Sequence, residues 1–199
     1  MKFHYMGKFD GNIESLPKRE HEPDAVMFKE PDDIKKFSTL MSVFSLIVLV
    51  VLTVVSEQIS NTIVFDIWGW LLFMLCLGVH EFLHAICFKE DVYMYNNLKQ
   101  GNLFVVGNES MTKFRFCFMS LLPCIILGVI PYILFLINNN FITLGTLGIL
   151  SLSSCVGDWY NVLNALTQMP KGAKTYLCGF NSYWYMPKKE DIENKENTK

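Results

Sequence analysis

The sequence predicts an all-α integral membrane protein with four transmembrane helices and a small cytoplasmic β element. Two observations lead to this fold class. Hydrophobic residues make up 51% of the 199 positions and the mean hydropathy is positive, which exceeds what a soluble domain of this size needs. Four apolar stretches are also long enough to cross a bilayer, which takes about 20 helical residues. They cover residues 37–56, 67–88, 116–137 and 141–166.

The basic residues all fall on one side of this four-span topology. Of the 17 Lys and Arg residues, seven precede the first span, four lie between the second and third, and six follow the fourth. Because basic flanking residues are retained in the cytoplasm, both termini are predicted to be cytoplasmic in a multi-pass protein of the cell membrane. The chain then divides into a cytoplasmic N-terminal arm (1–36), a four-span domain (37–166) with a cytoplasmic loop (89–115), and a cytoplasmic C-terminal segment (167–199).

The cytoplasmic loop contains the predicted β element. Two short β-type runs, 92–95 and 103–107, flank a polar break that contains glycine, a pattern typical of a β-hairpin. Further on, Tyr183-Trp184-Tyr185 has the aromatic composition of a strand, but it also suits an aromatic belt at the membrane interface. The six cysteines are scattered without a CxxC pair, which argues against a disulfide framework or a four-cysteine zinc ribbon.

The second predicted span carries His80-Glu81-Phe82-Leu83-His84. Residues four apart share one face of a helix, so both imidazoles can bind one metal ion. A Glu directly after the first His is the zincin arrangement, in which the carboxylate takes a proton from water activated by the metal. An ionised acid at such depth costs about 2.5 to 3.5 kcal/mol, and a divalent cation would offset this cost. The alternative is a histidine pair hydrogen-bonded to neighbouring helices, with Glu81 protonated or paired.

Catalytic zinc takes three protein ligands and leaves one position open. Asp158 is the expected third ligand, because it is the only acidic residue in the last two predicted spans. Its depth agrees with this role. At a rise of about 1.5 Å per residue, Asp158 lies at a level similar to those of His80 and His84.

Three residues near Asp158 leave alternatives open. Asn161, one turn later, is a candidate to hold the Asp158 carboxylate or a substrate backbone, or it is a helix-packing amide. Cys155, one turn earlier, is a candidate fourth ligand that would close the site and make it structural. Gly157 is expected to allow a close approach between helices.

Several motifs together resemble the bacterial putative zincin peptidase family, over nearly the whole chain. They are HEFLHAICF in the second span, MTKFRF before a third span that opens with SLLP, the Gly-Asp pair of the fourth span, and the C-terminal SYWYMP. The family is similar in architecture to site-2 intramembrane proteases, with HExxH on one membrane helix and an aspartate ligand on a later one. The resemblance implies His80, His84 and Asp158 as zinc ligands and Glu81 as the base. Site-2 proteases usually carry the aspartate in an Asn-Pro-Asp-Gly setting, whereas Gly157 and Trp159 flank it here, so substrate handling near this helix is expected to differ.

These features predict a zinc-dependent intramembrane or membrane-proximal endopeptidase. Its expected partners are the lipid bilayer and a membrane-associated protein or peptide substrate, with no nucleic acid. The main alternative is a non-catalytic metal-binding membrane protein that acts in sensing, structure or partner regulation. A metal transporter is a weaker alternative, because one acid in the last two spans is sparse lining for an ion path.

Overall fold

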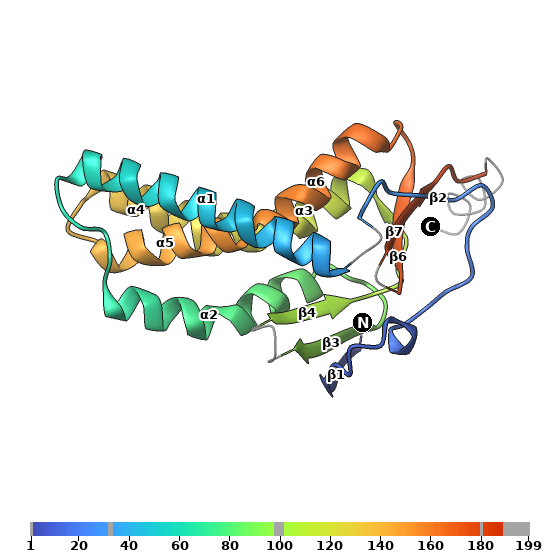
Figure 1. The fold of residues 1–199 in the computed structure, drawn as a ribbon. Coiled ribbons are helices and arrows are strands. Elements are labelled where there is room, and N and C mark those ends of the chain that lie inside the picture. The colour runs from blue at the N-terminus through green and yellow to red at the C-terminus, as the bar shows by residue number, and fades with distance from the viewer. Residues whose placement is uncertain (1, 32–33, 98–101, 180, 189–199) are drawn as a thin grey trace. The chain divides into compact units, whose positions relative to one another are not determined.

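A computed structural model describes residues 2–31, 34–97, 102–179 and 181–188 of the chain (Figure 1). The chain divides into two compact units, each assembled from separate stretches of sequence. The strand unit comprises Met1–Glu30, Phe88–Cys117 and Leu163–Lys199, and the helical unit comprises Pro31–Cys87 and Phe118–Val162.

Three helical stretches in the described residues are long and apolar enough to cross a membrane, judged by length and composition. The first is most of α1 (Ile34–Ser60), and the second is α2 (Ile67–Ala85). The third is a continuous run of α3 (Lys113–Pro123), the π-helical segment η2 (Cys124–Val129) and α4 (Ile130–Ile137). They correspond to the first three predicted spans, so the protein is mostly helical and compatible with a membrane.

The third stretch changes from α-helical to π-helical hydrogen bonding near two prolines. Pro123 ends α3, and Pro131 lies in the first turn of α4. Between them, the N–H of Ile130 bonds to the carbonyl of Ile125, five residues earlier. Because proline has no N–H to donate, an α-helical ladder cannot continue unchanged through Pro131, and a π-helical turn is a usual way to keep such a helix continuous.

The fourth predicted span, 141–166, occurs as two helices of 13 residues each, α5 (Ile142–Ser154) and α6 (Val156–Gln168). Cys155 separates them. The hydroxyl of Ser153 donates to the carbonyl of Ile149 at 2.8 Å, and that of Ser154 donates to the carbonyl of Ser151 at 2.9 Å. Hydroxyls that bond back to the preceding turn often bend a helix. Three spans are thus supported, and the continuous fourth helix that the sequence predicted is replaced by a broken one.

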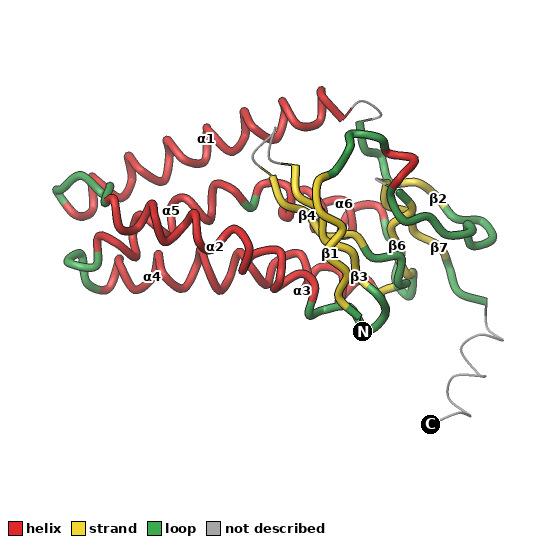
Figure 2. The backbone as a smooth tube through the Cα atoms, turned by 90° about the horizontal axis from the view of Figure 1, so that it is seen from below, coloured by secondary structure: helices red, strands yellow, loops and turns green. Residues whose placement is uncertain are grey.

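The central helix of the helical unit is α5, which contacts α1, α2 and α4 (Figure 2). Its contact with α4 requires a glycine, because a Cβ at Gly148 would lie 2.7 Å from the backbone nitrogen of Tyr132. The Tyr132 hydroxyl is in turn hydrogen-bonded to the buried Ser56 hydroxyl of α1 at 2.9 Å. These contacts hold α1, α4 and α5 together.

A polar clamp around Asp66 joins the N-terminal ends of α2 and α5. The Asp66 carboxylate accepts hydrogen bonds from the Gly69 N–H at 3.1 Å and the Thr143 hydroxyl at 2.7 Å, and the Asp66 N–H donates to the Thr146 hydroxyl at 3.0 Å. The bond from Thr143 lowers the pKa of Asp66 below its ordinary value, so this cap is ionised at neutral pH. The helices also touch closely here, since a Cβ at Gly69 would lie 2.6 Å from the Thr143 carbonyl oxygen and from Thr146 Cβ.

The strand unit contains the predicted hairpin within a three-stranded sheet. Strands β3 (Val92–Asn97) and β4 (Asn102–Val106) pair antiparallel, with Tyr95 opposite Phe104. Strand β1 (Phe3–Lys8) pairs parallel to β3, so the order is β1-β3-β4.

A second sheet of four strands contains the aromatic C-terminal segment. Its order is β2 (Val26–Met27), β7 (Asn181–Tyr185), β6 (Lys174–Cys178) and β5 (Met111–Thr112), with each neighbouring pair antiparallel. Of the two interpretations of Tyr183-Trp184-Tyr185, the structure has the strand. The N-terminal arm, for which no strand was predicted, contributes β1 and β2. The fold is therefore mostly helical with two small sheets rather than all-α.

Glu109 is a buried acid of the strand unit and ties down the segment that follows α2. Its carboxylate accepts hydrogen bonds from the N–H groups of Lys89 at 2.5 Å and Glu90 at 3.2 Å, and it forms an ion pair with Arg115. Burial by itself would raise the pKa of Glu109, but the hydrogen bonds from Arg115 and the two amides outweigh it and hold the pKa below its ordinary value. Glu109 is therefore engaged in a structural ion pair.

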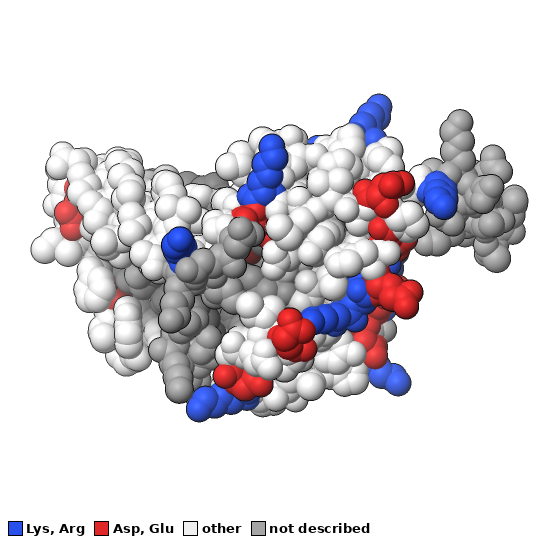
Figure 3. Space-filling model, turned by 45° about the vertical axis from the view of Figure 1, so that its right-hand side comes forward, with Lys and Arg blue, Asp and Glu red and all other residues white. Residues whose placement is uncertain are grey.

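The helices of the helical unit keep many large apolar side chains on the surface. On α1, for example, Leu46 and Val50 are 60% and 53% exposed. On the face drawn in Figure 3, charged side chains gather over the strand unit, and few lie over these helices. On a soluble protein, an apolar surface this large marks a site that binds another protein or a membrane. Helices that face lipid expose apolar side chains of the same kind.

Because Gly69 is in close contact with Thr143 and Thr146, we expect that it tolerates no side chain. Gly69→Ala should lower the stability of the protein by about 1 to 3 kcal/mol, the usual cost of overpacking a close contact. The measurement is thermal unfolding in detergent. Gly78→Ala is the matched control on the same helix, because a Cβ there would meet no atom within 4 Å. Equal melting temperatures for the two variants would contradict the close contact.

Candidate metal centre

Two helix ends bring the candidate ligands together. His80, Glu81 and His84 lie in the C-terminal part of α2, which ends at Ala85. Asp158 lies in the first turn of α6, directly after the break at Cys155. A carboxylate is stabilised at a helix N-terminus by the helix dipole, so the break gives Asp158 a position suited to its negative charge.

The donor atoms of three of these residues form a close cluster, in which each imidazole nitrogen faces a different oxygen of the Asp158 carboxylate. His80 Nε2 lies 3.3 Å from Asp158 Oδ2, His84 Nε2 lies 3.2 Å from Asp158 Oδ1, and the two Nε2 atoms are 3.2 Å apart. The three side chains are 16%, 12% and 14% exposed, in the order His80, His84, Asp158. With metal–nitrogen bonds of about 2.0 to 2.1 Å, the ligand atoms of tetrahedral zinc lie about 3.3 to 3.4 Å apart. The two Nε2 atoms thus have the separation of neighbouring zinc ligands, and the Asp158 carboxylate presents an oxygen to each of them at a similar distance.

A backbone carbonyl determines which nitrogen of His84 carries a proton. His84 Nδ1 lies 2.9 Å from the carbonyl oxygen of Met119, and a carbonyl can only accept, so the Nδ1–H donates. In the neutral ring Nε2 then has a lone pair, and this lone pair faces an oxygen of Asp158. Two acceptors at that separation need a proton or a cation between them. Metal-binding histidines commonly donate their other ring N–H to a carbonyl in this way.

Glu81 lies beside the same donor atoms. Its carboxylate and the imidazole nitrogens of His80 and His84 offer ligand atoms that all lie within 4.8 Å of one another. A carboxylate this close to the imidazole nitrogens could take a proton from a water that a metal bound there would activate.

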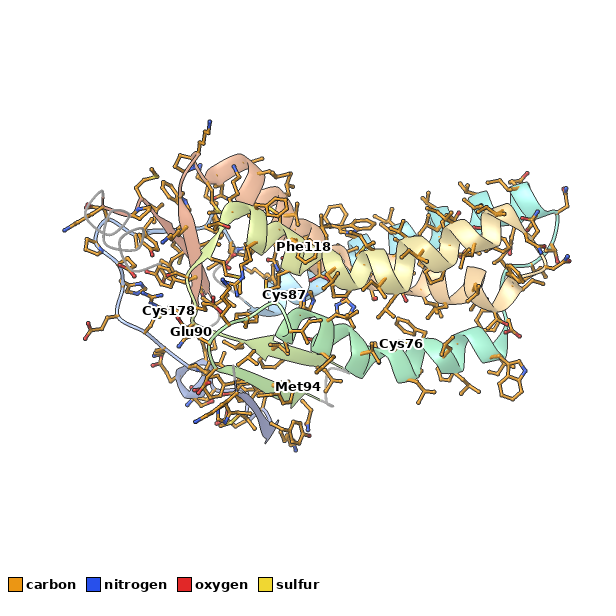
Figure 4. All side chains as sticks on the ribbon, turned by 180° about the vertical axis from the view of Figure 1, so that it is seen from behind. Cys76, Cys87, Glu90, Met94, Phe118 and Cys178 are labelled. Carbon is orange, nitrogen blue, oxygen red and sulfur yellow. The ribbon has the colours of Figure 1, made fainter. Side chains whose placement is uncertain are left out.

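Cys155 belongs to a second group of potential ligands. Its Sγ, a nitrogen of His80 and an oxygen of Asp158 also lie within 4.8 Å of one another. None of the six cysteines forms a disulfide, and four of them are half-buried: Cys76, Cys87, Cys117 and Cys178. Figure 4 labels Cys76, Cys87 and Cys178. Cys124 and Cys155 are buried, and Cys155 is fully enclosed.

The expectations for Asn161 and Gly157, on either side of Asp158 in the sequence, have different outcomes. Asn161 is half-buried on α6, and among the described residues its amide makes no hydrogen bond to the Asp158 carboxylate. Its role toward a substrate backbone stays a prediction. The expected close approach at Gly157 is wrong, because a Cβ there would meet no atom within 4 Å.

Met119 is the residue of this centre that sequence reasoning missed. It acts through its main-chain carbonyl, and any amino acid supplies one, so its side chain carries no signal. The donor set as a whole, two imidazoles and a carboxylate with a second carboxylate nearby, is one that zinc uses in catalytic sites.

The comparisons with known proteins agree with this donor set. The family described as putative zincin peptidase matches residues 71–174, just over half of the chain. The matched stretch contains His80, Glu81, His84 and Asp158. No curated protein and no solved structure matches the chain. The resemblance seen in the motifs is thereby confirmed, and this chain belongs to the putative zincin peptidase family.

Proposed function

We propose that this chain is a zinc-dependent endopeptidase that acts within or next to the membrane. Its ligands are His80, His84 and Asp158, and its base is Glu81. The observation that carries the proposal is the cluster of donor atoms, in which the two Nε2 atoms lie 3.2 Å apart and each lies 3.2 to 3.3 Å from one oxygen of the Asp158 carboxylate. The family match to a peptidase supports the reaction class.

In this mechanism each residue has a separate task. Bound zinc supplies the Lewis acidity that activates water and polarises the scissile carbonyl. Glu81 takes a proton from the attacking water and later passes it to the leaving amine. Met119 holds the His84 ring in the tautomer that leaves Nε2 free to bind, and the low exposure of the donor side chains keeps bulk water from competing for them.

We further propose a membrane arrangement in which α5 and α6 together make a fourth crossing. Both termini and loop 89–115 are then cytoplasmic, because all 17 basic residues lie in these segments and basic flanks are retained on that side. The metal centre lies in the cytoplasmic half of the bilayer, and the substrate is a membrane-associated protein or peptide. The similarity to site-2 proteases, with HExxH and the aspartate on separate membrane helices, is part of the same proposal.

The first test concerns the metal. Purified protein should hold close to one zinc per chain, and His80→Ala, His84→Ala and Asp158→Ala should each lower the occupancy strongly, since each removes one of the few bonds that hold the ion. Metal content by atomic emission on detergent-purified samples is the measurement. His4→Ala is the control, because His4 pairs with Asp91 in the strand unit. Full zinc in Asp158→Ala would show that the third ligand is another residue.

The second test separates an enzyme from a metal-binding scaffold. Glu81→Gln removes the proton acceptor but no ligand, so this variant should keep its zinc and its melting temperature and lose cleavage by about 100-fold or more. Glu57→Gln on α1 is the matched control and should cleave like the parent. The measurement is cleavage of membrane-associated peptides by the purified proteins. Cleavage by Glu81→Gln at the parental rate would rule out Glu81 as the base, and a parent that binds zinc without cleaving any peptide favours the scaffold.

The third test concerns topology. Single cysteines at Gly101 and Lys189 should react with a membrane-impermeant reagent only from the cytoplasmic side, and those at Asn61 and Asn139 only from the opposite side. Intact cells and inverted vesicles provide the two sides, and the native chain gives the background from its own thiols. A cysteine at position 139 that reacts from the cytoplasm would leave α5 and α6 without a crossing.

A further inference from the structure

The thiol of Cys155 is a group of the metal centre that the proposed mechanism does not use. It lies at the break between α5 and α6, where the backbone has φ −78° and ψ 10°. Its Sγ shares a space of at most 4.8 Å with His80 and Asp158, and the side chain is fully enclosed. An enclosed thiol beside a metal centre is a potential ligand, since thiolate is among the strongest that zinc accepts.

Cys124 provides the natural comparison. It is buried in the same cluster as Cys155 and Leu152, and its sulfur accepts a hydrogen bond from the Trp159 indole N–H at 3.1 Å. Unlike Cys155, it belongs to no group of three ligands in the described residues. The side chains of Cys124 and Cys155 are also hydrogen-bonded to each other. The two sulfurs thus share one environment, but only Cys155 is grouped with His80 and Asp158.

We propose that Cys155 Sγ is the fourth ligand of the resting metal centre and that it is displaced when the site becomes active. This inference rests on the proposed zinc site. Four protein ligands, His80, His84, Asp158 and Cys155, give a closed tetrahedral centre. The position that a catalytic water needs is then occupied by sulfur, and the resting enzyme is latent.

The exchange balances in protons and bonds. When the sulfur–metal bond forms, the thiol proton is released to solvent, as is general for metal binding by cysteine. When a water displaces the sulfur, that bond breaks and the thiolate takes up one proton. In this proposal Glu81 does not bind the metal in either state, and it has a metal-bound water to deprotonate only after the sulfur has left. One site can therefore contain both a catalytic base and a closed resting centre.

Cobalt in place of zinc tests the proposal directly. The Co²⁺-loaded parent should show a sulfur-to-cobalt charge-transfer band in the near ultraviolet, besides the visible d–d bands that any bound Co²⁺ gives. Cys155→Ser should lose the charge-transfer band and keep the d–d bands, while Cys124→Ser should keep both. Cys155→Ala serves as a second variant, and melting temperatures identify any variant that fails to fold.

The outcomes separate this inference from the proposed function. If the parent shows d–d bands and no charge-transfer band, Cys155 is not a ligand but the metal site stands. The same conclusion follows if the charge-transfer band disappears in Cys124→Ser and persists in Cys155→Ser. A parent that binds no Co²⁺ or Zn²⁺ overturns the zinc site itself. Displacement has its own test: acetohydroxamate, a small ligand for the metal, should abolish the charge-transfer band in the parent. A band that persists while the d–d bands shift shows a permanently bound sulfur.

Discussion

The close contact between Gly69 of α2 and Thr146 of α5 determines whether the metal ligands can meet. The two helices touch near their N-terminal ends. His80 lies further along α2, and Asp158 lies beyond the end of α5, in the first turn of α6. His80 follows Gly69 by 11 residues, and Asp158 follows Thr146 by 12. At a rise of about 1.5 Å per residue the two arms have nearly equal length. A shift of one helix by a single turn, about 5.4 Å, would separate the donor atoms by more than a metal ion can bridge.

The break at Cys155 has a different role, because it determines what surrounds Asp158. In an unbroken helix, Asp158 would lie in the interior, where all nearby N–H groups are engaged in the helical ladder. The break turns its position into a first turn, which favours the carboxylate, and it places the Cys155 thiol among the ligands. The hydroxyls of Ser153 and Ser154 accompany this break through their bonds to the preceding turn.

Local patterns predicted much of this structure. The spacing in His80-Glu81-Phe82-Leu83-His84 places both imidazoles on one helical face, and the depth of Asp158 along its span suggested that it would meet them, as the distances show. The hairpin followed from two short β-type runs around a polar turn. The contacts that could not be predicted join segments distant in sequence. Strand β1 pairs with β3 some 89 residues later, as in His4 opposite Tyr93. The alternation of polar and apolar residues over Lys2-Phe3-His4-Tyr5 is too short, in a polar and charged arm, to have marked a strand there.

A second limit comes from main-chain chemistry and helix geometry. The carbonyl of Met119 fixes the His84 tautomer, but a carbonyl is common to every residue. The break in the fourth predicted span accompanies hydrogen bonds from serine hydroxyls to the preceding turn. The average hydrophobicity of residues 141–166, from which the span was predicted, does not reveal such a break. Gly157 was expected at a helix contact because it is small, yet the contacts that require a glycine occur at Gly69 and Gly148. A small residue permits a close approach, but only the register of two helices decides which one is used.

The charges of the centre would link metal binding to the stability of the helical unit. Two imidazoles and a carboxylate near the end of α2 lie close to the Asp158 carboxylate in the first turn of α6, and each isolated ion in apolar surroundings is costly. The His84 lone pair and the Asp158 oxygen face each other at 3.2 Å, so the centre is complete only with a positive charge between them. A proton satisfies one such pair, whereas a divalent ion would satisfy both imidazole nitrogens and the Asp158 carboxylate together. If the proposed metal binds there, the same residues that would perform the chemistry would also stabilise the folded helical unit, since binding to a folded site stabilises the fold by mass action.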